Sequence, residues 1–363
     1  MKEIIGVFLK LGCIAFGGPA AHIAMMQEEL VEKRKWLSQE KFLSYIGLTQ
    51  LIPGPNSTEL VLHCGYERGG YKGLLAAGLS FLAPALLSTW ALAYVYVTYG
   101  NIPNVAAVFQ GIQAMVIVII FSALLKLAKK QYQPGSWVFF LIALTAIAAL
   151  GVAPCMVILI GGIIYLPLKK SATTVAPLTL WTTASVPTGS SIFWVFLKIG
   201  SILFGSGYVL IAYLEAMLVQ DLGWLNQQQL LDAVALGQFT PGPVLSTATF
   251  IGYILDGNIG AIAATTGIFL PAFVLVSFSG LFIKKLEGKS WFKLFLKGVN
   301  LAALAIFVVA MIKMIIPVYG DWFQLGVIAI GLLLHYRFKL TAPKLILIAI
   351  GFGLINIFFI QHY

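Results

Sequence analysis

The sequence predicts an all-α polytopic membrane protein made of two inverted-topology repeats. Composition, internal duplication and the placement of charge each support this prediction. Of the 363 residues, 60% are apolar or aromatic and only 10% are charged, whereas about a quarter of a soluble protein is charged. This composition excludes an ordinary soluble domain, a disordered chain and a disulfide-stapled secreted scaffold.

The two halves of the chain repeat each other. Residues 8–55 align with 196–243 at 20 identities in 48 positions and without a gap. After a single deletion in the second half, the alignment continues as far as Lys126 and Lys313. A fixed internal period is the signature of duplication. We therefore divide the chain into an N-terminal repeat, a Ser/Thr-rich uncharged linker and a C-terminal repeat, at residues 1–170, 171–190 and 191–363.

The cations orient the two repeats in opposite senses. Basic loops in the first half, such as 32–41 and 126–136, correspond to second-half loops without cations, and the loops 284–297 and 335–344 show the reverse. Under the positive-inside rule the basic loops are cytoplasmic. Of the 23 Lys and Arg residues, 19 then lie on six cytoplasmic loops. We expect a multi-pass protein of the plasma (inner) membrane, with both termini outside and the linker cytoplasmic.

The lengths of the apolar runs suggest five crossings per half. The segments on either side of each Pro-Gly-Pro have about a dozen residues, and both of their flanks carry the same charge bias. We expect them to form re-entrant hairpins at 42–66 and 230–254, which gives about 10 transmembrane helices plus two hairpins. The expected crossings are 4–31, 74–98, 105–126, 137–151 and 155–168, and then 192–219, 261–283, 298–313, 323–334 and 345–360.

Two Gly/Pro breaks recur in both halves, and such interruptions at equivalent positions of inverted repeats mark the binding sites of transporters. A proline suits the first position of a helix, and the amides after it, with the helix dipole, favour an anion. Simple kinks are the alternative, but the duplication favours a site. The predicted substrate-binding residues are Gly17, Gly18, Pro19, Gln50, Pro53, Gly54, Pro55, Asn56, Ser57, Gly205, Ser206, Gln238, Pro241, Gly242, Pro243, Lys10 and Lys198.

Ionisable residues within expected spans are candidates for function. Lys10 and Lys198 match across the repeats and either attract an anion or snorkel to the membrane interface. Glu59, Glu215 and His22 are candidates for proton coupling. Lys126 and Lys313 are most simply interface anchors.

Enzymatic and metal-binding motifs are absent from the sequence. The three cysteines have no metal-ligand spacing, and no ATPase, hydrolase, flavin or haem motif is visible. We expect no enzyme activity, no cofactor and no metal site.

The stretch FGGPAAHIAMMQEELVEKRKWLSQEKFLSYIGLTQLIPGP and its second-half form resemble the signature of the chromate ion transporter family. The likeness covers nearly the whole chain and is to the long-chain, two-repeat members. It implies a membrane carrier that exports chromate, with sulfate as a close analogue. The halves differ, because His22 is replaced by Leu210, so any ligands they contribute are unequal.

Together these observations predict a secondary transporter that exports chromate by alternating access and holds it at Gly/Pro-broken helix N-termini. A dianion leaving a cell gains roughly 4.6 kcal/mol per 100 mV, so the membrane potential suffices and proton exchange would add to it. The alternative is a sulfate or other oxyanion permease on the same scaffold. We expect a chromate- or sulfate-like dianion and the lipid bilayer as partners, and no nucleic acid; a homodimer is left open.

Overall fold

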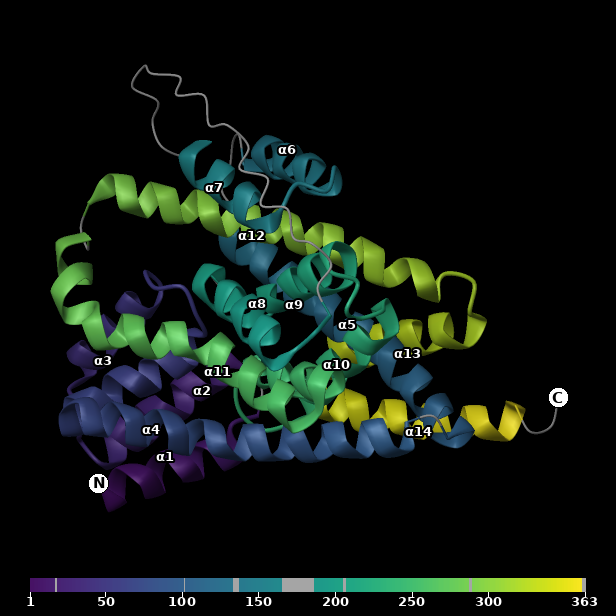
Figure 1. Cartoon of the computed structure of the whole chain (residues 1–363), viewed down its shortest axis with the longest axis horizontal. Coiled ribbons are helices and arrows are strands. Elements are labelled where there is room, and N and C mark those ends of the chain that lie inside the picture. Colours follow the sequence, from purple (N-terminus) through teal and green to yellow (C-terminus); the bar gives the residue numbers. More distant parts are fainter. Residues whose placement is uncertain are drawn as a thin grey trace.

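The computed structural model describes residues 1–16, 18–100, 102–132, 137–164, 186–204, 207–286 and 289–360, and within these ranges it contains helices and no strand (Figure 1). Four helical stretches are long and apolar enough to cross a membrane: Asn56–Tyr99, Ala107–Gln131, Val244–Phe278 and Trp291–Ile315. Shorter apolar helices accompany them. The prediction of an all-α membrane protein is confirmed at this level.

The helices of the two halves follow one another in the same order. The first half contains α1 (Lys2–Ile14), α2 (Pro19–Met26), the π-helix η1 (Gln27–Lys33), α3 (Gln39–Thr49), α4 (Asn56–Tyr99), α5 (Pro103–Gln131), α6 (Trp137–Ala149) and α7 (Pro154–Ile164). The second half contains α8 (Gly189–Ile202), α9 (Val209–Leu214), the π-helix η2 (Glu215–Asp221), α10 (Gln227–Phe239), η3 (Val244–Ser246), α11 (Thr247–Leu286), α12 (Ser290–Ile315), η4 (Ile316–Val318), α13 (Trp322–Phe338) and α14 (Ala342–Ile360).

Local irregularities recur at equivalent positions and show that the duplication is structural. Ser38 caps α3 by accepting from the Lys41 amide, and its counterpart Asn226 caps α10, because side-chain oxygens satisfy the free amides of a helix start. Within α4 the backbone bends at Gly70, and α11 bends at Gly257, with φ of 60° and 53°. Each expected hairpin arm therefore continues through a glycine kink into the following long helix.

The sequence predicts that the segments 4–31 and 192–219 each cross the membrane once. In the first segment the structure instead has separate helices that run in opposite directions. Gly18, with φ of 81°, precedes a new helix that starts at Pro19. The chain turns back there, so Lys10 of α1 lies 3.4 Å from Glu29 of η1. Hydropathy counts only the length of an apolar run, whereas a Gly-Pro break ends one helix and starts another in a new direction.

The second segment is interrupted at the same place. Helix α8 ends at Ile202, and α9 begins at Val209. The start of α8 lies beside the kink of α11, because a Cβ on Gly189 would come 2.6 Å from Ile259. Both expected crossings are thus pairs of shorter helices.

This turn also changes the expected position of the N-terminus. Glu3 accepts from Arg34 at 3.1 Å and from Arg68 at 3.3 Å. These arginines belong to the basic loops 32–41 and 66–73. The start of the chain therefore shares a face with the basic loops, which corrects the expectation that they lie on opposite sides.

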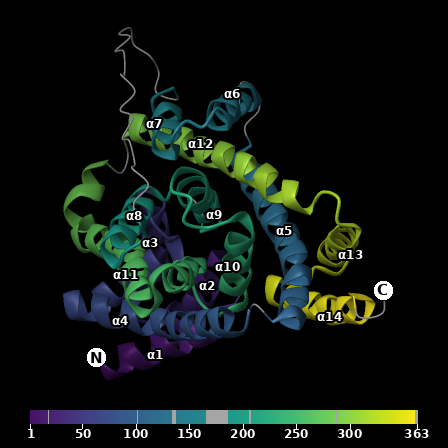
Figure 2. The same cartoon turned by 45° about the vertical axis from the view of Figure 1, so that its right-hand side comes forward.

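Helices of each repeat pack against helices of the other repeat. Helix α5 packs against α13 and α14 of the other half, and α12 packs against α6 and α7 (Figures 1 and 2). Glycines allow this approach: a Cβ on Gly111 would come 2.6 Å from the Ala349 carbonyl oxygen, and one on Gly161 would come 2.8 Å from that of Gly298. Close packing at small residues is the usual way in which membrane helices associate.

Candidate functional site

The duplicated breaks meet crosswise between the repeats. The Gly54 amide donates to the carbonyl of Leu203 at 2.6 Å, and the Gly242 amide donates to the carbonyl of Ala15 at 2.7 Å. In the ungapped alignment of the two repeats, Gly54 is equivalent to Gly242 and Ala15 is equivalent to Leu203. The two hydrogen bonds are therefore equivalent to each other. Each Pro-Gly-Pro is therefore bonded to the first break of the other half, and the breaks converge as the sequence predicts.

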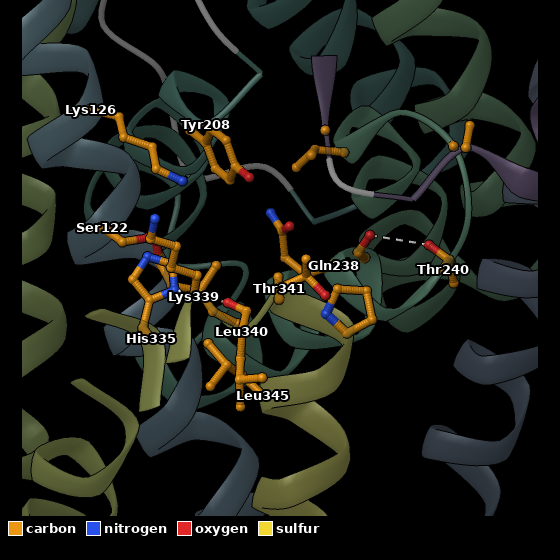
Figure 3. Close-up of a pocket in the computed structure, with 18 of the residues that line it drawn as sticks. Ser122, Lys126, Tyr208, Gln238, Thr240, His335, Lys339, Leu340, Thr341 and Leu345 are labelled. Carbon is orange, nitrogen blue, oxygen red and sulfur yellow. Dashed lines mark hydrogen bonds between the residues drawn. The ribbon is translucent and has the colours of Figure 1, made fainter. Parts of the chain in front are cut away.

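A cavity of about 460 Å³ lies beside one of these crossings (Figure 3). Ala15, Gly18 and Gly242, which belong to this crossing, are among its lining residues. From there it extends to Lys126 on α5 and to the connection between α13 and α14. The second-half Pro-Gly-Pro and the first-half break thus face one shared space.

The cavity is positively charged. Lys126 and Lys339 line it, and no aspartate or glutamate is among the described residues of its lining. Neither lysine forms an ion pair with another residue in the described part of the chain. Both lysines are exposed, so they act as two cations without an ion pair at the border of the cavity, where they raise the local concentration of anions.

Gln238 supplies a hydrogen-bond donor to the same space. Its side chain is only 8% exposed, and its amide nitrogen has no hydrogen-bond partner among the residues that the structure describes. Figure 3 shows that this amide and the Lys126 ammonium point into the cavity beside Tyr208. A buried donor without an acceptor is costly, so the geometry suits a ligand that accepts hydrogen bonds.

A helix start also borders the cavity. Val244 lines it and begins η3, which continues directly into α11. The first amides of a helix have no acceptor within the helix, and the dipole favours negative charge there. Cations, an amide donor and a helix start together make this cavity a candidate site for a small oxyanion.

The first-half Pro-Gly-Pro does not face this cavity. The Glu59 carboxyl lies against Gly54, where it would collide with any Cβ. In the second half Thr247 follows Gly242 by five residues, as Glu59 follows Gly54, and its hydroxyl donates to the Val244 carbonyl at 2.8 Å. The two repeats thus differ at their matching breaks: one is filled by its own side chain and the other is open.

The predicted binding residues divide into three groups. Gly18, Gln238 and Gly242 line the cavity, and Pro19, Pro241 and Pro243 adjoin them in the chain. The first-half residues lie outside the lining: Gln50, Pro53, Gly54, Pro55, Asn56 and Ser57. Gly17, Gly205 and Ser206 lie outside the described residues.

The structure does not bring the two repeat-matched lysines into the cavity lining. Lys10 forms an ion pair with Glu29, and its side chain is 59% exposed. Lys198 lies within electrostatic range of Asp221. Each of these two cations therefore already has a carboxylate nearby.

The three proton-coupling candidates have different surroundings. His22 places its Nε2 3.1 Å from the Ala15 carbonyl oxygen, and Glu215 accepts from Gln220 at 2.8 Å. Glu59 is fully buried, and within the described part of the chain neither of its carboxyl oxygens has a hydrogen-bond partner. Glu59 is thus the candidate whose carboxyl is left unsatisfied.

Sequence reasoning missed several residues of the cavity. Lys126 was interpreted as an interface anchor, and Lys339, Tyr208 and Thr240 were not singled out. Lys126 recurs in the second repeat as Lys313, and this recurrence was the available signal. Thr240 directly precedes the second-half Pro-Gly-Pro and Tyr208 follows the second-half break, so their place in the chain was a further signal. Lys339 has no such signal and lies in the connection between α13 and α14.

Comparisons with known proteins agree with the arrangement of two repeats. The family model described as chromate transporter matches the chain twice, at residues 2–166 and 190–355. A probable chromate transport protein of Synechococcus elongatus is 33% identical over 377 residues, covering 98% of this chain and 95% of that protein. The chromate transport protein of Cupriavidus metallidurans is 31% identical over 381 residues, covering 100% of this chain and 94% of that protein.

The alignment with a third relative covers less of both chains. The chromate transport protein of Pseudomonas aeruginosa is 33% identical over 309 residues, covering 78% of this chain and 73% of that protein. No solved structure matches the chain. The two matches of one family model and the identity over nearly the full length establish that the chain belongs to the chromate transporter family.

Proposed function

We propose that this protein exports chromate across the plasma (inner) membrane as a secondary transporter that works by alternating access. The observation that carries this proposal is the cavity, in which Lys126, Lys339 and the unpaired Gln238 amide meet without a carboxylate. Such a set of groups fits a small dianion. The names of the relatives direct the choice among dianions to chromate.

The face that the cavity adjoins indicates the side from which the dianion loads in this conformation, and the driving force sets the direction of transport. Lys126 and Lys339 belong to basic connections, which the positive-inside rule assigns to the cytoplasm. A dianion therefore loads from the cytoplasm in this conformation. Its exit gains roughly 4.6 kcal/mol per 100 mV of membrane potential, so the potential alone drives export.

Glu59 is the group best suited to add proton exchange. As a carboxylate it would be a buried charge without a partner, which is far more costly than the neutral acid. It therefore holds a proton in this conformation. When the other face opens, the first-half Pro-Gly-Pro and Glu59 reach external water, as exchange of conformation between inverted repeats requires. Proton exchange then requires Glu59 to take up its proton from this water and to release it to the cytoplasm on the return step, before the next dianion is carried outward. Glu215 and His22 already have partners and are secondary candidates.

Transport into inverted membrane vesicles tests the proposal, with the potential and the pH gradient set independently. We expect uptake of labelled chromate, accelerated by a potential that is positive in the lumen, and competition by sulfate, because the two ions share charge and shape. Uptake of sulfate without chromate would favour the alternative of a sulfate permease. No uptake of either ion would defeat the proposal.

Substitutions in the cavity test where the ion binds. Lys126→Gln removes a cation that lines the cavity, and we expect the KM for chromate to rise roughly tenfold, the loss typical of a hydrogen bond to a charged group. Lys129→Gln is the matched control, because Lys129 lies on the same helix outside the lining. Equal effects of both variants would contradict this placement of the site.

A further inference from the structure

Lys313 occupies in the second repeat the position that Lys126 occupies in the first. The alignment of the repeats pairs them, and they lie near the ends of α12 and α5. Figure 1 shows that α12 runs from left to right in the view, whereas α5 begins at the right, near the end of α4. Lys126 precedes a basic connection, and Lys313 precedes the connection 314–322, which has an aspartate and no cation. The two lysines thus belong to opposite faces.

The two lysines differ in their partners. Lys126 lines the open cavity without an ion pair among the described residues. The Lys313 ammonium lies 3.8 Å from an oxygen of Glu215, whose side chain is only 2% exposed. The same oxygen accepts from Gln220 at 2.8 Å, and Asp221 also lies within electrostatic range of Lys313.

The acid that pairs with Lys313 has no counterpart in the first repeat. Glu215 is the first residue of η2, and the first residue of η1 is Gln27. The ungapped part of the repeat alignment pairs these two positions. The first repeat therefore places a neutral amide where the second places a carboxylate.

We propose that Lys313 contacts the dianion in the opposite-facing state and that Glu215 replaces the dianion on Lys313 when that face closes. This inference rests on the proposed function. Inverted repeats exchange conformations during alternating access, so in the opposite state Lys313 lines the cavity as Lys126 does here. The observed ion pair is then the closed form of that second cavity, with a side-chain carboxylate standing in for the substrate.

This asymmetry makes the two faces bind the dianion unequally. On the face of Lys126, Gln27 carries no charge and does not compete with the dianion. On the face of Lys313, Glu215 competes with it and promotes release. The KM for chromate is therefore lower on the Lys126 face. Without a potential or ion gradient, the ratio of maximal flux to KM must be the same for both faces. The maximal flux from the Lys126 face is therefore lower in the same proportion as its KM, and the equilibrium distribution of chromate is unchanged.

Kinetics from each face of sealed, oriented vesicles test the inference at zero membrane potential. Lys313→Gln is expected to raise the KM roughly tenfold from the Lys313 face only, by loss of a charged hydrogen-bond donor. Lys313→Arg, which keeps the charge, is expected to preserve that KM. Lys126→Gln is expected to show the mirror-image result, a higher KM from the Lys126 face only.

Exchange of the two η-helix residues gives a sharper test. Glu215→Gln is expected to lower the KM from the Lys313 face, and Gln27→Glu is expected to raise it from the Lys126 face. The double variant Gln27→Glu/Glu215→Gln is expected to reverse the order of the two KM values. A requirement for structure alone would not reverse this order, since it would impair both faces together.

The outcomes separate this inference from the proposed function. Absence of chromate flux from the Lys126 face of the wild-type protein would defeat the proposed function. Normal wild-type flux, with Lys313→Gln changing both KM values equally, changing neither or abolishing flux from both faces, would overturn the role of Lys313. Failure of Glu215→Gln to lower the KM from the Lys313 face would overturn the role of Glu215.

Discussion

The Gly242 amide donates a hydrogen bond to the Ala15 carbonyl at 2.7 Å and thereby joins the Pro-Gly-Pro of the second repeat to the first break of the first repeat. The His22 imidazole lies 3.1 Å from the same carbonyl oxygen. The equivalent bond between Gly54 and Leu203 completes a crosswise pair. Because both bonds link one repeat to the other, movement of one half against the other acts on both breaks. One of them, at Ala15 and Gly242, lines the cavity.

The first prediction concerns the glycine at this junction. Gly242 has φ of 102°, and a Cβ there would come 2.7 Å from the Cβ of Ala85. We expect Gly242→Ala to insert in the membrane but to transport at less than about a tenth of the wild-type rate, because a positive φ costs a side chain about 1–2 kcal/mol and the contact displaces the break. Vesicle flux, normalised to the amount of protein inserted, measures this effect.

Two other glycines serve as comparisons for that variant. Gly54→Ala places a Cβ against Glu59 and should impair transport similarly. Gly6 is helical, and a Cβ there meets nothing within 4 Å, so Gly6→Ala should transport normally. Wild-type flux from both Gly54→Ala and Gly242→Ala would show that the breaks are not the site.

The second prediction concerns Gln238, whose buried amide nitrogen has no partner. Gln238→Leu removes a donor without leaving another group unpaired, so we expect unchanged thermal stability together with a KM for chromate raised roughly tenfold. Gln238→Glu adds a negative charge to the cavity and should abolish chromate binding. Tighter binding by Gln238→Glu would contradict an anion site.

The convergence of the breaks could be predicted because the same Gly/Pro motifs occur in both repeats. Two Gly/Pro interruptions at equivalent positions in both halves are rarely accidental, and the structure joins them through Gly54 and Gly242. The composition of the cavity could not be predicted in this way. Lys339 and Tyr208 share the cavity with residues of the first half because the two halves pack together. A single sequence does not reveal which helices pack against each other.

The error over segment 4–31 has a different cause. The segment has the length of a crossing, and length was the criterion. Its break at Gly18 and Pro19 was interpreted as an interruption within a span, whereas the pairs Lys10–Glu29 and Glu3–Arg34 show a reversal of direction. The same charges would have indicated the reversal, because buried or interfacial acids need partners.

The third prediction concerns proton exchange at Glu59. Glu59→Gln replaces a buried neutral acid by a neutral amide of similar shape, so the protein should insert and keep its transport driven by the potential. An acidic lumen should accelerate chromate uptake into inverted vesicles in the wild type, since protons then leave the lumen as the dianion enters. We expect this acceleration to be lost in Glu59→Gln.

A matched control is available for the Glu59 experiment on the neighbouring helix. Glu40 lies in the first turn of α3 and is exposed, so Glu40→Gln should keep the response to pH. If Glu59→Gln retained the full acceleration by an acidic lumen, Glu59 would not be the coupling group. If the wild type showed no acceleration, transport would depend on the potential alone.

The fourth prediction concerns the face on which the chain begins. Glu3 pairs with Arg34 and Arg68, so a tag placed before Met1 and a cysteine introduced at Ser38 should be accessible from the same side. Ser38 lies in the basic loop 32–41, which the positive-inside rule places in the cytoplasm. Both positions should therefore react with a membrane-impermeant reagent in inverted vesicles and be protected in intact cells. Labelling of the tag in intact cells, with Ser38→Cys protected, would show that the segment from α1 to η1 crosses the membrane once. It would contradict the reversal at Gly18, on which the geometry of the cavity depends.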